Sequence, residues 1–339
     1  MGATAPTATL QPLSIARRAL RAGDVDIRIT HCGVCHSDLH TCRGDWGPAH
    51  YPLVPGHEIV GEVVGLGRDV TRFQIGQRVA VGTLVDSCGE CAQCLRGHQQ
   101  YCLRGNTATY NSVDAESGDT TQGGYSERIV VDARFVLRVP DGLDSAAAAP
   151  VLCAGITVWS PLRHWEVGPG TRLGVVGLGG LGHMAVKLGA ALGADVGVFT
   201  RSPDKAEEAG QLGASHTVVS TDRAQLKRAR GQYDVIIDTV PVAHDLGPYL
   251  ASLAVDGTLV IVGAIAPLEF HGARLITGRK SIAGSLTGGV AETQELLDFC
   301  AEHGVGADVE AVALGDVNQA WQRMEAGDVR YRFVIDMGR

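Results

Sequence analysis

The sequence predicts an α/β protein that is built from two domains. At 339 residues, the chain is longer than one hydrophobic core usually organises. Its first 150 residues consist of short β-like runs punctuated by glycine, whereas strand-like and helix-like segments alternate from about Asp144 onward. Because such alternation builds a parallel sheet with helices on both faces, we expect a β-rich domain followed by a doubly wound sheet.

Composition and charge exclude several classes of protein. Hydrophobic residues make up 45% of the chain and charged residues 19%, and the formal net charge is −8. This composition is typical of globular proteins, and the acidic balance argues against binding that depends on neutralising nucleic-acid phosphates. The N-terminus lacks the apolar core of a signal peptide, and the longest uncharged apolar stretch, Leu173–Val186, is too short and too rich in glycine for a membrane span. We therefore expect a cytoplasmic protein with no nucleic-acid or membrane partner, whose nine cysteines point to metal ligands before disulfides.

The β-rich part begins with a strand near residue 25. Apolar residues occupy every second position from Val25 to Ile29, which is the period of a half-buried strand. Further β-rich runs cover Glu58–Leu66 and Gln77–Val81, with glycine turns around them. The pair Asp144-Ser145 can cap a short alanine-rich helix that ends near Pro150.

Six strand-like runs follow, with helix-length segments between them. They are Arg172–Val176, Val196–Phe199, His216–Val219, Val235–Ile237, Thr258–Val262 and Ser281–Gly284. After about Thr287, the pattern predicts one helix over Ala291–His303 and a final strand over Tyr331–Asp336. These segments complete the predicted α/β organisation.

Four cysteines form one closely spaced set. Cys88, Cys91, Cys94 and Cys102 follow the pattern C-x2-C-x2-C-x7-C in a polar segment. Four thiolates at such spacings can surround one Zn²⁺ tetrahedrally and leave no open position, so we expect a structural zinc site. An iron–sulfur cluster is the alternative, but the bacterial ferredoxin pattern ends in x3-C-P, whereas Leu103 follows Cys102.

A glycine-rich turn follows the first strand of the α/β part. Residues 172–183, RLGVVGLGGLGH, place the pattern G-x-G-x-x-G between a predicted strand and a predicted helix. In this context the pattern indicates a Rossmann dinucleotide site, because the turn brings backbone amides and the helix N-terminus to the pyrophosphate. The residues expected to bind the cofactor here are Gly177, Leu178, Gly179, Gly180, Leu181 and Gly182.

The end of the next strand indicates which dinucleotide is bound. An acidic residue at that point would hold the ribose 2′-hydroxyl of NAD. This chain instead has two hydroxyls and an arginine at the strand end, with a lysine close behind, and these groups suit a 2′-phosphate. We therefore expect NADP(H) rather than NAD(H), bound through Thr200, Arg201, Ser202 and Lys205.

The stretch HCGVCHSDLHTC, residues 31–42, holds three cysteines, three histidines and one aspartate. Such a set indicates a metal site. The spacing of Cys32 and Cys35 is also that of half a zinc finger or of a redox dithiol.

Taken together, several stretches resemble the zinc-dependent medium-chain alcohol dehydrogenases, and within them the cinnamyl alcohol dehydrogenase-like branch. They are Gly33–His40, Val54–Glu58, the four-cysteine run, Gly123–Tyr125, Val151–Thr157 and the glycine pattern that starts at Gly177. The resemblance covers nearly the whole chain. It implies a GroES-like catalytic domain from residues 1–154 and 288–339, a Rossmann domain with a six-stranded doubly wound parallel sheet from residues 155–287, and a homodimer or homotetramer.

The resemblance also implies a catalytic zinc. Cys35, His57 and Cys153 would bind it, and the fourth position would be left for water, substrate oxygen or, transiently, Glu58. Asp38 would hydrogen-bond His57 and fix the tautomer of the imidazole. In this interpretation Cys32 is a packed neighbour rather than a ligand. The chain would then hold two Zn²⁺ ions, one catalytic and one structural.

The same resemblance assigns a proton relay and further cofactor contacts. The hydroxyl of Ser37 would take the proton of the alcohol, which would pass by way of the cofactor ribose to His40 and bulk water. Thr157, Gly263 and Ser285 match family positions beside the cofactor.

The expected activity is the NADP(H)-dependent interconversion of primary alcohols and aldehydes, aromatic or aliphatic, by hydride transfer. One alternative on the same scaffold is a reductase of C=N or conjugated C=C bonds. Ser37 and His40 argue against it, because such reductions need less proton shuttling. An alternative of another class is a non-catalytic NADPH-binding zinc protein, but its signature would be the loss of zinc ligands, and all of them are retained. A zinc-finger nucleic-acid binder conflicts with the acidic charge.

Overall fold

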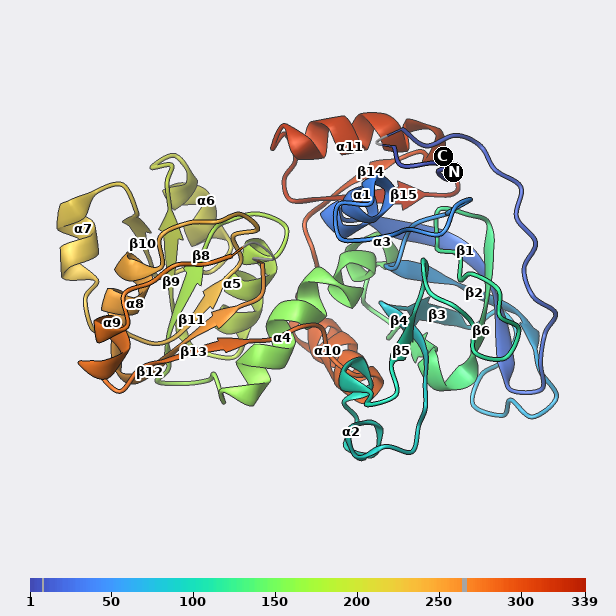
Figure 1. Ribbon diagram of the computed structural model, residues 1–339, viewed down its shortest axis with the longest axis horizontal. Coiled ribbons are helices and arrows are strands. Elements are labelled where there is room, and N and C mark those ends of the chain that lie inside the picture. Colours follow the sequence, from blue (N-terminus) through green and yellow to red (C-terminus); the bar gives the residue numbers. More distant parts are fainter. Residues whose placement is uncertain (8, 264–266) are drawn as a thin grey trace. The chain divides into compact units, whose positions relative to one another are not determined.

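The structure is a computed structural model that describes residues 1–7, 9–263 and 267–339 (Figure 1). The chain forms two compact units, residues 1–153 with 288–339 and residues 154–287. The first boundary lies one residue before the expected one, because Ala154 is the first residue of helix α4 (Ala154–His164).

A seven-stranded sheet organises the first unit. Its order is β14-β15-β1-β2-β3-β7, with β6 paired to β1. The strands are β1 (Asp24–Val34), β2 (Ile59–Leu66), β3 (Arg78–Val81), β6 (Arg128–Asp132), β7 (Leu137–Arg138), β14 (Val309–Val312) and β15 (Arg332–Asp336). Strand β1 is central, since its first half pairs with β6 and its second half with β15. The predicted alternation is confirmed, because Val25, Ile27 and Ile29 are buried in the core.

Shorter elements complete this unit. The helical elements are α1 (His36–Arg43), α2 (Ala92–Leu95), η1 (Gln99–Tyr101), η2 (Ala133–Phe135), α3 (Ser145–Ala148), η3 (Ala149–Leu152), α10 (Val290–His303), η4 (Leu314–Asp316) and α11 (Val317–Glu325). Strands β4 (Leu84–Ser87) and β5 (Asn106–Ala108) pair as a two-stranded sheet. As expected, Asp144 caps α3, because its carboxylate accepts a hydrogen bond of 2.9 Å from the amide of Ala147.

The second unit is a six-stranded parallel sheet with the order β10-β9-β8-β11-β12-β13. Its strands are β8 (Arg172–Val176), β9 (Asp195–Thr200), β10 (His216–Val219), β11 (Tyr233–Asp238), β12 (Leu253–Ile261) and β13 (Ser281–Gly284). Besides α4, the helices are α5 (Gly182–Ala191), α6 (Lys205–Gln211), α7 (Arg223–Arg228), α8 (Gly247–Ser252) and α9 (Ala273–Ile276). The strand order is that of the Rossmann fold and reverses between β8 and β11, where such sheets bind their ligands.

Among the described residues, no single helix is long and apolar enough to cross a membrane. The segments Ser145–Leu152 and Ala154–His164 meet the length and composition only as a pair, which is bent by 58°.

The turn between β8 and α5 is too tight for side chains at two of its glycines. Gly177 has a φ of +91°, which is in the left-handed region that favours glycine. A Cβ on Gly182 would lie 2.1 Å from the carbonyl oxygen of Gly177, whereas a Cβ on Gly179 would meet no heavy atom within 4 Å. The protein therefore packs against Gly182 and leaves space at Gly179.

This difference predicts that two alanine substitutions differ in their effect on stability. We expect Gly182→Ala to lower the free energy of unfolding by about 1–3 kcal/mol, because the added methyl group forces backbone to move. Gly179→Ala, the matched control, should leave it nearly unchanged. Thermal and urea unfolding of the two variants would measure the effect, and an equal loss of stability in both would contradict this packing.

Candidate active site

Four potential metal ligands converge in the first unit. They are Cys35, His57, Glu58 and Cys153, and their ligand atoms all lie within 4.8 Å of one another. Cys35 lies between β1 and α1, His57 and Glu58 come directly before β2, and Cys153 follows η3. Residues that are far apart in the sequence therefore meet because three loops end at the same place.

The distances in this cluster suit a single zinc ion. The sulfur atoms of Cys35 and Cys153 are 4.0 Å apart. Two sulfurs bound to one tetrahedral Zn²⁺ at about 2.3 Å would lie about 3.8 Å apart. With one imidazole beside two thiols, the donor set is that of catalytic zinc sites, which keep a position open for substrate.

The carboxylate of Asp38 holds these loops together. It is fully buried and accepts four hydrogen bonds, each of 3.0 Å. The donors are the backbone amides of Cys35 and Gly56, the Nδ1 of His57 and the hydroxyl of Tyr125. The expected contact between Asp38 and His57 is therefore present, and it leaves Nε2 of His57 as the nitrogen that can face a metal.

The buried charges of the cluster shift the pKa values of His57 and Cys35. Burial alone would lower the pKa of His57, but the carboxylate of Asp38 and the thiol of Cys35 raise that pKa well above its usual value. The neighbouring thiol of Cys153 and the imidazole of His57 hold the pKa of Cys35 well below its usual range, although burial opposes this shift. The site therefore stabilises a thiolate, which is the form that binds metal.

Arg332 contacts Glu58, and the sequence did not identify it as a residue of the site. Its guanidinium donates hydrogen bonds to Oε1 of Glu58 and to the carbonyl oxygen of Val34, and both charged groups are buried. Burial raises the pKa of Glu58 to about 7, and the positive charge of Arg332 limits that shift. The second oxygen, Oε2, has no hydrogen-bond partner among the described residues, so one carboxylate oxygen is anchored and the other is available.

The residues expected to form a proton relay lie on α1. The hydroxyl of Ser37 is 3.5 Å from Sγ of Cys35. His40 lies one turn further along, where its Nδ1 is 2.8 Å from Oδ2 of Asp45 and its ring stacks on Trp46. Asp45 is a second residue that the sequence did not single out, and it orients the imidazole of His40.

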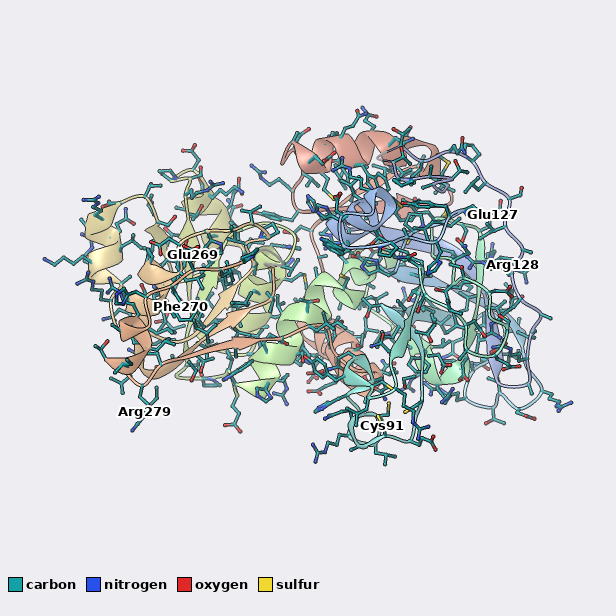
Figure 2. All side chains as sticks on the ribbon, in the orientation of Figure 1. Cys91, Glu127, Arg128, Glu269, Phe270 and Arg279 are labelled. Atoms are coloured by element: carbon teal, nitrogen blue, oxygen red, sulfur yellow. The ribbon has the colours of Figure 1, made fainter. Side chains whose placement is uncertain are left out.

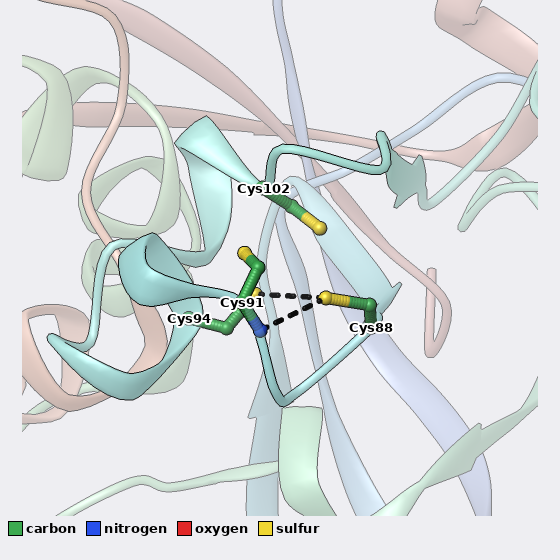
Figure 3. Close-up of side chains that lie close together, drawn as sticks. All are labelled: Cys88, Cys91, Cys94 and Cys102. Carbon is green, nitrogen blue, oxygen red and sulfur yellow. Dashed lines mark hydrogen bonds between the residues drawn. The ribbon is translucent and has the colours of Figure 1, made fainter.

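The four-cysteine set forms the second cluster (Figure 3). The ligand atoms of Cys88, Cys91, Cys94 and Cys102 lie within 4.8 Å of one another. The sulfurs of Cys88 and Cys94 are 3.8 Å apart, which is the separation expected for two ligands of one tetrahedral zinc. Hydrogen bonds from the amides of Cys94 and Leu103 lower the pKa of Cys91 to about 6. Cys91 lies on the lobe that carries α2 (Figure 2).

The residues expected to bind a dinucleotide lie in the second unit. The fingerprint occupies the turn after β8, and Thr200, Arg201 and Ser202 occupy the end of β9 and the residues after it. Lys205 joins these two segments, because its ammonium donates a hydrogen bond of 3.2 Å to the carbonyl oxygen of Leu178.

The three remaining cofactor candidates have different positions. Gly263 lies against the loop after β11, where a Cβ would come within 2.4 Å of the backbone of Thr239. Ser285 directly follows β13, and Thr157 lies in α4.

Comparisons with known proteins give a consistent set of relatives. Residues 21–141 match the alcohol dehydrogenase GroES-like domain, and residues 180–302 match the zinc-binding dehydrogenase family. The chain is 51% identical over 338 residues to the NADP-dependent alcohol dehydrogenase C of Mycobacterium bovis, an alignment that covers 99% of this chain and 96% of that protein. It is 48% identical over 342 residues to the aldehyde reductase YahK of Escherichia coli, with coverage of 99% and 97%.

A solved structure extends the likeness to the fold. A cinnamyl alcohol dehydrogenase from Sorghum bicolor superimposes with a TM-score of 0.96 at 48% sequence identity. The superposition covers 99% of this chain and 96% of that one.

The network around Asp38 predicts how strongly this carboxylate supports metal binding. We expect Asp38→Asn to weaken zinc binding at the cluster of Cys35, His57 and Cys153 by roughly 10–100-fold, the range typical for partners of metal-bound histidines. Chelator competition with zinc counting would measure it, since one ion per chain should be lost early.

The partly buried carboxylate of Asp26, which pairs with Arg128 outside both metal clusters, offers a matched control. Asp26→Asn should release zinc like the unchanged protein. If Asp38→Asn retained both ions with the same affinity as that control, Asp38 would have no part in metal binding.

Proposed function

The chain belongs to the zinc-binding alcohol dehydrogenase family, and from this membership we propose that it interconverts primary alcohols and aldehydes by hydride transfer with NADP(H). The observation that carries the proposal is the buried cluster of two thiols and one imidazole in the first unit. Its sulfur separation and donor set fit a zinc ion with an open position. Both aromatic and aliphatic substrates belong to the proposed range.

Two zinc ions are proposed for each chain. Cys35, His57 and Cys153 would hold the first, with Glu58 as an occasional fourth ligand, and Cys88, Cys91, Cys94 and Cys102 would hold the second. The first ion, when bound, would act as a Lewis acid toward the oxygen of a carbonyl or alcohol substrate. The second has four protein ligands and would stabilise the lobe that carries them.

The residues at the end of β9 support NADP(H) as the cofactor, which supplies the hydride. Arg201 is exposed, and the hydroxyls of Thr200 and Ser202 flank it. A guanidinium beside two hydroxyls can form charge-assisted hydrogen bonds with a 2′-phosphate. The mycobacterial relative is named as NADP-dependent, which agrees with this choice.

The protein itself handles the proton of the substrate. The hydroxyl of Ser37 lies beside Sγ of Cys35 and would accept the proton of a substrate alcohol. His40 donates from Nδ1 to Asp45, so its Nε2 is the nitrogen that would exchange a proton with water. The side chain of His40 is 34% exposed, which gives that exchange access to solvent.

Three further proposals concern the organisation and setting of the enzyme. The first unit would supply the catalytic groups and the second would bind the dinucleotide. We also propose a homodimer or homotetramer, because β13 is an edge strand and exposed apolar side chains, Val255 and Ile276, lie on neighbouring segments of the same unit. A cytoplasmic setting would keep the thiols of both clusters reduced and available to metal.

A screen of NADPH oxidation tests the proposed activity. We expect turnover with aliphatic, cinnamyl-type and benzylic aldehydes, lower turnover with NADH, and none with iminium or conjugated C=C substrates alone. Cys153→Ser should nearly abolish this turnover, because it removes a proposed zinc ligand. The matched control is Cys300→Ser, which changes a buried cysteine of α10 outside both clusters. Turnover retained in Cys153→Ser would refute the catalytic zinc.

A charge reversal at Arg201 tests the choice of cofactor. We expect Arg201→Asp to lower the ratio of kcat/KM for NADPH to that for NADH by roughly tenfold or more, because a carboxylate repels the 2′-phosphate and the charge-assisted hydrogen bond is lost. Arg223→Asp provides a control at an exposed arginine on α7. Steady-state kinetics with both dinucleotides would measure the ratio, and an unchanged ratio in Arg201→Asp would remove this residue from cofactor selection.

A further inference from the structure

The loop after β11, residues 239–245, lies against the glycine fingerprint. The backbone amide and the hydroxyl of Thr239 both donate to the carbonyl oxygen of Val176, at 3.1 and 2.7 Å. A Cβ on Gly177 would lie 3.0 Å from Oγ1 of Thr239. Because the strand order reverses between β8 and β11, this loop begins at the switch point of the sheet.

The loop after β12 supports the same residues from the other side. The amides of Val262 and Gly263 donate to the carbonyl oxygen of Asp238 at 3.0 and 3.2 Å. Gly263 also packs so closely on Thr239 that a Cβ would come within 2.4 Å of its backbone. Asp238 and Thr239 are therefore held between the ends of β8 and β12. The position of the rest of the loop then depends on the conformation of the residues that follow Thr239.

Hydrogen bonds of His244 fix the conformation of these residues. The carboxylate of Asp238 is fully buried, and its Oδ1 accepts a hydrogen bond of 3.1 Å from the amide of Val240. Its Oδ2 is 2.9 Å from Nε2 of His244, and Nδ1 of the same ring is 2.8 Å from the carbonyl oxygen of Val242. A carbonyl oxygen only accepts, so Nδ1 carries a hydrogen, and Nε2 shares one further proton with Asp238. The ring thus ties residues 242–244 to the same buried carboxylate that accepts the amide of Val240.

The ring of His244 also connects the loop with the end of β9. Tyr249 packs edge-on against it with ring centroids 5.9 Å apart, and Tyr249 packs on Phe199 at 5.3 Å. Phe199 is the next-to-last residue of β9, directly before the proposed 2′-phosphate contacts. Burial and the charge of Asp238 raise the pKa of Tyr249, and the charge of Arg201 opposes that shift.

We propose that His244 is a positioning residue for the dinucleotide, which holds residues 239–244 in the conformation that lines the phosphate-binding turn. The inference rests on the proposed use of NADP(H). A loop fixed in advance loses little conformational freedom when the cofactor binds, whereas a loop released from Asp238 must be ordered at that moment. The residue acts through Asp238 and the backbone and takes no part in the chemistry.

The test measures cofactor binding and catalysis separately. We expect His244→Leu to raise the Kd of NADPH by roughly tenfold, the scale of a lost hydrogen bond to a charged group, with kcat at saturating NADPH within about twofold of the unchanged protein. His244→Gln retains an amide donor for Asp238 and should recover much of the affinity. Fluorescence titration with NADPH gives the Kd, and the thermal midpoint without cofactor reports folding.

His216 offers a matched control in the same unit. It also bonds a side chain, since its Nε2 is 2.9 Å from the hydroxyl of Tyr233, but it begins β10 at the opposite ends of the strands. His216→Leu should leave the Kd of NADPH unchanged. If His244→Leu bound NADPH as tightly as this control, the positioning role would be refuted. Failure of the unchanged protein to bind NADPH would instead overturn the proposed function.

Hydrogen exchange keeps the inference testable if His244→Leu does not fold. In the unchanged protein, NADPH should slow the exchange of the amides of Thr239 and Val240 and leave those around His216 unaffected. Exchange at residues 239–244 that is indifferent to NADPH would overturn the proposal, because the loop would then have no part in binding.

Discussion

The active site depends on one buried charge, the carboxylate of Asp38. A carboxylate without solvent is costly unless hydrogen bonds replace its hydration, and Asp38 obtains four of them. The donors come from the start of α1, from the turn before β2 and from Tyr125. These segments can satisfy the carboxylate only if they occupy one arrangement, and in that arrangement Cys35 and His57 face each other.

The packing around Gly56, in the turn before β2, is tight. Gly56 has a φ of +107°, and a Cβ there would lie 2.7 Å from the ring of Tyr125 and 2.9 Å from the sulfur of Cys32. Cys32 is fully buried and is not part of either metal cluster. Cys32 therefore packs behind the site, although it lies only three residues before a proposed ligand. Its spacing with Cys35 does not indicate half a zinc finger or a redox dithiol.

Much of the fold could be predicted from local patterns because those patterns arise from burial. The six strands of the parallel sheet were recognisable since each is a short apolar run between turns, although β12 begins at Leu253, before the apolar part that predicted it. Helix α11 was missed, yet its buried residues Val317, Ala320, Trp321 and Met324 follow the spacing i, i+3, i+4, i+7. Arg332 and Asp45 were missed for a different reason. Arg332 acts by contacting Glu58, and Asp45 acts by contacting His40. These contacts form only in the folded chain, and no local sequence pattern indicates them.

Both units contain a buried aspartate–histidine pair, but the two pairs have different roles. In each, a fully buried aspartate near the end of a strand or the start of a helix holds a histidine, Asp38 with His57 and Asp238 with His244. What differs is the second nitrogen of the ring. In His57 it faces two thiols, so the imidazole can be a metal ligand, whereas in His244 it is bound to a backbone carbonyl and can only shape a loop. A buried aspartate–histidine pair therefore does not by itself indicate catalysis, and the partner of the remaining nitrogen decides its role.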